Sequence, residues 1–386
     1  EDFMKEEQEA PEEVQEELIK DISSDETDVN VPELEPEDAV IHPPKNPGQS
    51  VFSNMEEMIE QVTEEEIKNF EQIYIVACGS AWHVGVEAQY VIEELAQIPV
   101  RVELASEFRY REMPLAKDGL VIVISQSGET ADTLAAMRMA KDKGLATLAV
   151  VNVIGSSIAR EADKVFYTLA GPEISVATTK GYSAQLAALD CIAVQFAKVK
   201  GLITDEQYSY YISELQTIPE KIEKILQDKE RIQWFAAKYA NAHDVFFVGR
   251  GVDYAVCLEG SLKLKEISYI HSEAYAAGEL KHGTISLIAD NILVIGVLTQ
   301  SKLYEKTVSN MMECKSRGAY LMGVTNYGNY EMEDKVDFTV YVPKVDEHFM
   351  GSLSVIPLQL LGYYVSVAKG LDVDKPRNLA KSVTVE

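Results

Sequence analysis

The segment Ser125–Thr130 reads Ser-Gln-Ser-Gly-Glu-Thr, and it lies between an apolar run and a helical pattern. Its three hydroxyls, its glycine and the backbone N–H groups at a helix start could hold an anion, because the helix dipole adds positive potential there. Serine and threonine also cap helices without binding any ligand, so the motif alone leaves both interpretations open. The anion that such a loop fits best is a phosphate group.

Three other side chains could take part in acid–base or nucleophilic chemistry. The carboxylate of Glu266 can accept a proton, and His282, expected on a loop after a glycine-rich stretch, titrates near neutral pH. Lys381 is the sixth residue counted from the end of the sequence and carries an amine. Taken singly, such residues are more often a surface glutamate, a loop histidine and a tail lysine without a role.

Cysteine and histidine spacing argues against a bound metal. The four cysteines lie far apart, with no CxxC pair and no histidine at ligand spacing: Cys78, Cys191, Cys257 and Cys314. We therefore expect no metal, no cofactor and no disulfide framework, and a reducing cytoplasm as the compartment.

The elements that must position these residues alternate in type. Strands are expected at 73–77, 100–104, 120–124, 147–151 and 164–169, with helices at 82–97, 131–143 and 179–198. After a helical stretch at 206–241, further strands are expected at 244–248, 292–297, 320–324 and 338–342, with helices at 303–317 and 352–368. Short, uniformly apolar strands between helices indicate a parallel sheet covered on both faces.

The order of elements in the first half returns in the second. Three pairs of matching residues accompany it: Gln126-Ser127 and Gln300-Ser301, Asn152 and Asn326, and the Ser-Glu pairs at 106–107 and 272–273. The first two matches are each 174 residues apart. The fold class predicted is α/β, with two doubly wound parallel-sheet domains that arose by duplication.

The duplicated loop has diverged. The second copy reads Thr-Gln-Ser-Lys-Leu-Tyr at 299–304 and lacks the equivalents of Gly128 and Thr130. One phosphate site is therefore expected rather than two.

Charge is concentrated at the start of the sequence. Residues 1–40 hold 17 acidic residues and 2 lysines within a net charge of −28. This proline-rich segment is expected to be a solvated linker, with a short helix possible at 6–20. The negative excess disfavours nucleic acid and anionic membranes as partners. No run approaches the ~18 apolar residues of a membrane span, and no apolar signal core is present at the start.

Longer motifs in the sequence resemble those of known protein families. Ser125–Thr130 resembles the phosphate loop of sugar isomerase (SIS) domains. The stretches EGSLKLKEISY at 259–269, AGELKHG at 277–283 and DVDKPRNLAKSVTVE at 372–386 resemble the isomerase half of the glucosamine-6-phosphate synthase family (glutamine–fructose-6-phosphate aminotransferase, isomerizing). The resemblance runs from about residue 50 to the end. It implies an acidic linker at 1–50, SIS domains at 51–215 and 216–371, and a tail at 372–386 that covers the active site.

The resemblance also implies a reaction. Fructose 6-phosphate would be the substrate, and glucosamine 6-phosphate or glucose 6-phosphate the product. Glu266 would move a proton between two sugar carbons, and Lys263 would assist near the hydroxyls. His282 would open the sugar ring, from the neighbouring subunit of a homodimer. Lys381 would form a Schiff base with the open-chain ketose, and burial under the tail would lower its pKa.

Substrate contacts follow from the same resemblance. It assigns them to the side chains of Ser80, Ser125, Gln126, Ser127 and Thr130 and to the backbone of Val176 and Ala380. One position departs from the family, because Ala81 stands where a serine is usual. That hydroxyl contact is lacking, and Ser80 is expected to replace part of it.

The family's full enzyme begins with a glutaminase domain whose N-terminal cysteine attacks glutamine. Here the sequence starts at Glu1 with no cysteine before Cys78, so we expect an isomerase half that needs a glutaminase partner to obtain ammonia. Two alternatives are a different SIS enzyme, such as a fructosamine-phosphate deglycase, and a non-catalytic sugar-phosphate sensor. The motif at 374–386 argues against the first, and the joint presence of Glu266, His282 and Lys381 argues against the second.

Overall fold

The structure is a computed structural model that describes residues 61–384. The acidic segment 1–50 and its possible helix at 6–20 lie outside the described residues.

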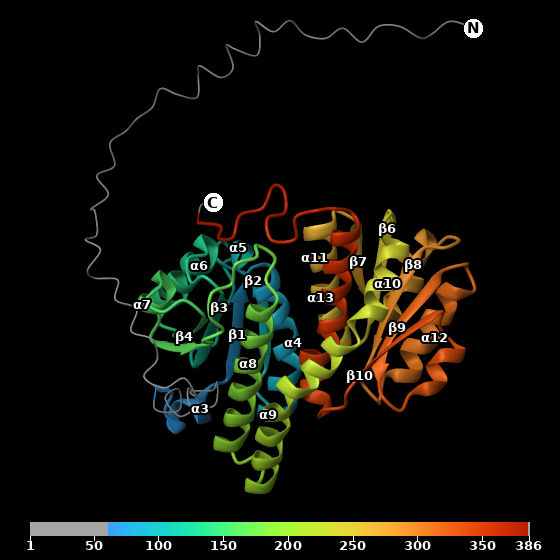
Figure 1. Cartoon of the computed structure of the whole chain (residues 1–386). Coiled ribbons are helices and arrows are strands. Elements are labelled where there is room, and N and C mark those ends of the chain that lie inside the picture. Colours follow the sequence, from blue (N-terminus) through green and yellow to red (C-terminus); the bar gives the residue numbers. More distant parts are fainter. Residues whose placement is uncertain (1–60, 385–386) are drawn as a thin grey trace, which may run out of the picture. The chain divides into compact units, whose positions relative to one another are not determined.

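Two parallel sheets of five strands each form the framework (Figure 1). The first sheet contains β1 (Gln72–Ala77), β2 (Val100–Leu104), β3 (Gly119–Ser125), β4 (Ala146–Val151) and β5 (Lys164–Tyr167). The second contains β6 (Asp244–Gly249), β7 (His271–Ala276), β8 (Leu293–Leu298), β9 (Tyr320–Asn326) and β10 (Phe338–Val342). Their orders, β2-β1-β3-β4-β5 and β10-β9-β8-β6-β7, are the same once β6 is equated with β1. The predicted pair of doubly wound domains is confirmed.

Helices cover both faces of the first sheet. They are α4 (Gly79–Ala96), α5 (Ala105–Phe108), α6 (Ala131–Asp142), α7 (Ser157–Glu161) and α8 (Lys180–Val199). Alternate residues of β1 join different cores: Ile73 and Ile75 belong to the cluster with α4 and α8, and Tyr74 and Val76 to the cluster with α5, α6 and α7. A strand buried on both faces must be apolar at every position, which explains the continuous apolar run.

The second sheet is covered in the same way. Its α-helices are α9 (Asp205–Gln227), α10 (Lys229–Tyr239), α11 (Val252–Ser268), α12 (Tyr304–Lys315) and α13 (Gly351–Ala368). Short 3-10 helices are η2 (Ala277–His282), η3 (Thr284–Leu287), η4 (Tyr330–Asp334) and η5 (Glu347–Phe349). The predicted helix at 206–241 is two helices, because the chain leaves helical geometry at Asp228. α9 runs through residue 215, and the domain boundaries at 50, 215 and 371 stay predictions.

One strand was missed, and one proposed match between the copies was wrong. β7 reads His-Ser-Glu-Ala-Tyr-Ala and lies at the edge of its sheet, where half-exposed positions accept polar residues. Its Ser272 and Glu273 therefore lie inside a strand. Ser106 and Glu107 lie in α5, after β2. The two Ser-Glu pairs do not correspond.

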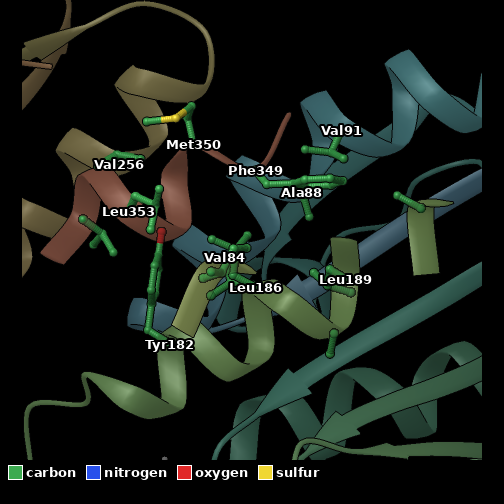
Figure 2. Packing of buried hydrophobic residues seen from close by; sticks show 14 of the residues in the cluster. Val84, Ala88, Val91, Tyr182, Leu186, Leu189, Val256, Phe349, Met350 and Leu353 are labelled. Carbon is green, nitrogen blue, oxygen red and sulfur yellow. The ribbon is translucent and has the colours of Figure 1, made fainter. Parts of the chain in front are cut away.

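The two domains share one core. Figure 2 shows side chains of α4 and α8 packed against residues of α11, η5 and α13 within a single apolar cluster. The labelled residues are Val84, Ala88, Val91, Tyr182, Leu186, Leu189, Val256, Phe349, Met350 and Leu353. Since this cluster continues across both domains, the position of α11 relative to α4 is fixed by packing.

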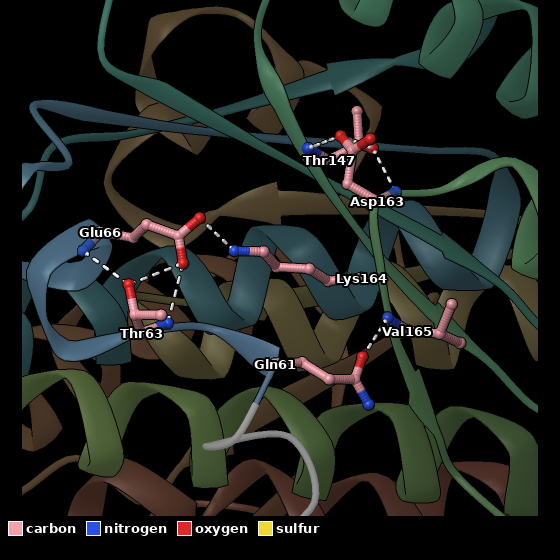
Figure 3. Close-up of polar contacts among 7 residues, drawn as sticks. All are labelled: Gln61, Thr63, Glu66, Thr147, Asp163, Lys164 and Val165. Atoms are coloured by element: carbon pink, nitrogen blue, oxygen red, sulfur yellow. Dashed lines mark hydrogen bonds and ion pairs between the residues drawn. The ribbon is translucent and has the colours of Figure 1, made fainter.

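The short helix α3 (Glu64–Asn69) secures the free edge of the first sheet (Figure 3). Thr63 and Glu66 form a capping box at its start, and Glu66 also pairs with Lys164 on the edge strand β5. The backbone N–H of Val165 donates to the side chain of Gln61 at 2.9 Å. These bonds occupy an edge that would otherwise present unpaired backbone groups.

Within residues 61–384, one segment is long and apolar enough to cross a membrane, Glu347–Ala368, which contains α13. Because 78% of it is buried inside the protein, it is a core helix.

The carboxyl group of Glu87 is buried where α4 meets the other domain. The Tyr182 hydroxyl donates a hydrogen bond of 2.8 Å to it, and a Cβ on Gly351 would lie only 1.4 Å from its other oxygen. Burial raises the pKa of Glu87 to about 8. The folded chain therefore holds a proton here that the unfolded chain releases above pH ~4.5.

We expect the free energy of unfolding to fall as pH rises between about 5 and 8, by up to about 1.4 kcal/mol per pH unit from this group. Glu87→Gln keeps the shape and removes the titration, so its stability relative to the wild type should improve over that range. Urea unfolding at pH 5, 6.5 and 8 measures the difference. The exposed Glu71→Gln is the control and should follow the wild type. Parallel profiles for Glu87→Gln and the wild type would contradict the assignment.

Candidate active site

A cavity of about 290 Å³ opens at the carboxyl edge of the first sheet. Two segments line it: Cys78–Ala81, where α4 begins after β1, and the loop Ser125–Thr130 after β3. β1 and β3 are neighbours at the point where the strand order reverses, the usual place for a ligand in an open α/β sheet. α11 of the second domain and the end of the chain, Leu379–Val383, complete the wall.

The loop after β3 keeps hydroxyl groups available for a ligand. Ser125 Oγ accepts a 3.0 Å hydrogen bond from the N–H of Gly128 and shares another of 3.0 Å with Thr130. Ser127 Oγ accepts from the N–H of Glu129 at 3.2 Å, which leaves its own O–H as a donor. Thr130 precedes α6 but makes no side-chain capping bond. Helix capping therefore does not account for this hydroxyl.

Gly128 allows the loop to turn tightly. Its φ is +66°, and a Cβ there would lie 2.0 Å from Oγ of Ser156, a buried residue. A larger residue would require both a left-handed backbone and displacement of Ser156.

The end of the chain is hydrogen-bonded to the rim of the cavity. The carbonyl of Asp374 accepts from the N–H of Val176 at 3.0 Å, and the carbonyl of Val383 accepts from the N–H of Ala131 at 3.1 Å. Lys381 Nζ donates to the carbonyl of Ser175 at 2.6 Å. These bonds place the amine of Lys381 in the cavity wall.

A buried ion-pair array lies along α11. Lys263 is 2% exposed, and its Nζ lies 3.5 Å from Glu259 and in closer contact with Glu266. The three residues share one helix face because they are spaced three and four positions apart. Neither contact has hydrogen-bond geometry, so among the described residues Lys263 Nζ has no hydrogen-bond partner. Lys263 and Glu266 line the cavity, where a ligand hydroxyl could use these N–H groups.

The two lysines of the cavity are shifted in opposite directions. Burial disfavours the charge on Lys263, but the carboxylates of Glu259 and Glu266 outweigh it and raise its pKa. Burial lowers the pKa of Lys381, and the nearby charge of Lys263 lowers it further. The environment of Lys263 therefore favours its ammonium form, and that of Lys381 makes it lose its proton more easily to give the neutral amine.

All but one of the residues predicted from the sequence line this cavity: Ser80, Ser125, Gln126, Ser127, Thr130, Val176, Lys263, Glu266, Ala380 and Lys381. Ala81 lines it too. His282 does not, and it ends the 3-10 helix η2 instead of lying on a loop, with its side chain exposed. The roles given to these residues stay predictions.

Sequence reasoning missed several members of the site. Cys78, Thr178 and Gln185 also line the cavity. Behind it, His83 Nδ1 lies 2.8 Å from Glu259, which is fully buried. The helical spacing in EGSLKLKE could have identified Glu259 as a partner of Lys263. Nothing in the sequence connects it to His83.

The corresponding loop of the second sheet is hydrogen-bonded to a glutamate of the protein itself. The N–H of Ser301 donates to the carboxylate of Glu347 at 3.3 Å, and the side chain of Gln300 donates to the Glu347 carbonyl at 3.0 Å. A carboxylate thus takes the position of an anion in this copy. A cavity of about 290 Å³ lies beside this loop as well, so the expectation of a single phosphate site stays a prediction.

Among residues 61–384, no group of three His, Cys, Asp or Glu side chains is arranged to hold a metal ion. The four cysteines are free thiols.

Comparison with known proteins gives concordant matches. The SIS domain family matches residues 66–195 and 238–369. Glutamine–fructose-6-phosphate aminotransferase [isomerizing] of Caldanaerobacter subterraneus is 54% identical over 88% of this chain and 55% of its own length. The Clostridium acetobutylicum protein of the same name is 55% identical over 84% of this chain and 54% of its own length. This chain spans about half the length of these curated relatives.

Solved structures agree. The C-terminal domain of glucosamine-fructose-6-phosphate aminotransferase from Francisella tularensis superposes with a TM-score of 0.80 and 37% identity, over 85% of this chain and 94% of that one. Glucosamine-6-phosphate deaminase from Thermotoga maritima superposes with a TM-score of 0.67 at 23% identity, over 87% of this chain and 99% of that one, a likeness of fold.

A pair of glycine substitutions tests how the loop is built. Gly128→Ala and Gly155→Ala both put a side chain on a backbone with positive φ, but a Cβ at Gly155 meets no atom within 4 Å. Each should cost about 1–2 kcal/mol for the left-handed backbone. Gly128→Ala should cost about 1–3 kcal/mol more, because it overpacks against Ser156. Thermal or urea unfolding of the two variants measures the difference, and equal costs would contradict this account of the loop.

Proposed function

Because this chain belongs to the SIS domain family, with two such domains in tandem, we propose that it binds fructose 6-phosphate in the cavity at the edge of the first sheet and isomerises it. The observation that carries the proposal is the composition of that one cavity. It combines a hydroxyl-rich anion loop, a carboxylate beside a permanently charged lysine and a second lysine with a lowered pKa. A site that only recognised sugar phosphates would need the loop alone.

The phosphate group is assigned to the loop Ser125–Thr130. The O–H groups of Ser127 and of the Ser125–Thr130 pair can donate to phosphate oxygens, and the start of α6 adds positive potential. Ser80, Gln126 and the backbone of Val176 and Ala380 are assigned to the sugar and phosphate oxygens, since all four line the cavity.

Ring opening is assigned to His282 of a second copy of the chain. His282 is exposed and does not line the cavity of its own chain, which supports a contribution to the cavity of another copy. The active form is then a homodimer in which each cavity is completed across the interface.

The proton transfer is assigned to Glu266. Lys381 attacks the C2 carbonyl of the open-chain ketose and holds it as an imine, formed with loss of water. Water then releases Lys381 and restores the C2 carbonyl, whereas ammonia releases Lys381 and leaves an imine of ammonia at C2. Either group acidifies the C1–H bond. Glu266 takes the proton from C1, and returning it to C2 moves the carbonyl equivalent to C1. The ammonium of Lys263 stabilises negative charge that develops on the neighbouring oxygen. With a carbonyl at C2 the product has a hydroxyl there and is glucose 6-phosphate, and with an imine of ammonia at C2 the product has an amino group there and is glucosamine 6-phosphate.

Nitrogen would come from outside this cavity. The matched relatives are about twice as long and are named as aminotransferases that use glutamine. We assign to this chain the isomerising half of that reaction. Glucosamine 6-phosphate would be its product when a glutaminase domain supplies ammonia, and glucose 6-phosphate would be its product when none does. Free thiols and the negative charge suit work in the cytoplasm without nucleic-acid or membrane partners.

Replacing a serine of the loop tests the phosphate assignment. Ser127→Ala should weaken fructose 6-phosphate binding by about 1.5–3 kcal/mol, because a hydrogen bond to a charged group is lost. Ser301→Ala is the matched control, since it removes the equivalent hydroxyl from the second loop, and it should bind normally. Titration calorimetry measures both. Unchanged affinity in Ser127→Ala and in Thr130→Ala would exclude this loop as the phosphate site.

Removing the base tests the reaction. Glu266→Gln removes the carboxylate that accepts the proton, so it should abolish conversion of fructose 6-phosphate to glucose 6-phosphate. Because the substitution keeps the side-chain shape, it should leave binding nearly intact. In the wild type, deuterium at C1 should appear partly at C2, because one carboxylate carries it. A chelator should have no effect. Full activity in Glu266→Gln, or loss of wild-type activity to the chelator, would refute the mechanism.

Mixing two inactive variants provides the control for folding. In a dimer of one Glu266→Gln chain and one His282→Ala chain, one cavity receives both intact residues. An equal mixture that exchanges subunits should therefore regain about a quarter of wild-type activity. No recovery from folded, exchanging variants would place His282 in a cavity of its own chain or outside the reaction.

A further inference from the structure

A buried His–carboxylate pair lies directly behind the cavity. His83 on α4 belongs to the first domain, and Glu259 on α11 belongs to the second. Nδ1 of His83 lies 2.8 Å from the Glu259 carboxylate, and the two residues are 9% and 0% exposed. Since an ionised carboxylate can only accept hydrogen bonds, the hydrogen of this bond is on Nδ1.

Ion pairs link the His83–Glu259 pair to Lys263 and Glu266, which line the cavity. The other oxygen of Glu259 lies 3.5 Å from Nζ of Lys263, which in turn contacts Glu266 in the cavity. Two carboxylates therefore share one buried ammonium ion. Glu259 has two partners, His83 and Lys263, and neither it nor His83 lines the cavity.

We infer that His83 is a positioning residue for the reaction: its Nδ1–H group holds Glu259, and thereby keeps Lys263 in contact with Glu266. The inference rests on the proposed function, because it concerns the residues assigned to proton transfer. His83 would then belong to the residues that support proton transfer, although it touches neither the substrate nor the reacting carbon.

The physical reason is competition for Lys263. A buried carboxylate must be compensated by charge or hydrogen bonds. Without the N–H of His83, Glu259 would keep only Lys263, and the ammonium would move towards it from its present 3.5 Å. Glu266 would lose its counter-ion and its fixed orientation. Binding of the phosphate, on the opposite loop, would change little.

The place of His83 on α4 strengthens this assignment. The same helix begins at Gly79 with the turn that lines the cavity, and His83 lies one helical turn further on. Its ring also packs edge-on against Trp82, with ring centroids 5.3 Å apart. The hydrogen bond therefore fixes the helix of one domain to the charged helix of the other beside the reacting groups.

Three substitutions separate the hydrogen bond from packing. Asparagine can put an amide N–H where histidine has Nδ1–H, glutamine puts the same group one methylene further out, and leucine has no donor. For fructose 6-phosphate isomerisation by the 386-residue chain, His83→Leu and His83→Gln should lower kcat by about tenfold or more, the order expected for a lost hydrogen bond to a charge. KM should stay within about twofold, and His83→Asn should keep most of the wild-type kcat.

An exposed pair of the same chemistry supplies the control. Nδ1 of His271 lies 2.7 Å from Asp244 at the surface, where the histidine side chain is 66% exposed. His271→Leu should leave kcat and KM unchanged. Wild-type kcat in His83→Leu would overturn the inference, as would His83→Asn as impaired as His83→Leu, or a change confined to KM.

A stability measurement separates this inference from the proposed function. If the wild type failed to isomerise fructose 6-phosphate, the proposed function would be wrong. The coupling between His83 and Lys263 could still be measured from the free energies of unfolding of His83→Leu, Lys263→Met and the double variant. His83 and Lys263 are linked through Glu259, so the two effects should be non-additive. Additive effects would overturn the inference.

Discussion

A buried ammonium ion, that of Lys263, is the constraint on which the site depends. A charge that is 2% exposed costs several kcal/mol unless it is paired, and Glu259 and Glu266 provide the pairing. Glu259 in turn needs His83, which comes from the other domain. The ion pairs are therefore complete only when the two domains are docked. The apolar cluster shared by α4, α8, α11 and α13 holds the two domains together in this docked arrangement.

Duplication of the fold created two equivalent sheet edges, and divergence gave them different tasks. In the first copy, Gly128 turns the loop and leaves the hydroxyls available. In the second, the aligned position is Lys302, and the carboxylate of Glu347 fills the place of an anion. The second copy contributes through α11 instead, whose charged residues line the cavity of the first. One copy thus carries the hydroxyl-rich loop Ser125–Thr130, and the other supplies the charged helix.

The sequence predicted the parts of this structure that depend on local pattern. Central strands buried on both faces are continuous apolar runs, so they were identified, whereas the edge strand β7 is half polar and was not. The loop Ser125–Thr130 was recognised from adjacent residues. The contact of His83 with Glu259 joins positions 176 apart, and only the docking of two domains creates it. The place of Lys381 depends on backbone hydrogen bonds of the tail, to which side-chain patterns give no signal.

The two lysines of the cavity show how one site can hold the same side chain in two charge states. Lys263 has carboxylates as neighbours, which stabilise its ammonium form and raise its pKa. Lys381 is half buried, and its Nζ donates to a backbone carbonyl, that of Ser175, which positions the amine without pairing it with a carboxylate. Burial and the charge of Lys263 then lower the pKa of Lys381. Environments that push two like groups apart in this way divide electrostatic and nucleophilic roles between them. The fixed charge of Lys263 therefore acts twice: it orders the carboxylate beside it, and it favours the neutral, reactive form of the amine across the cavity.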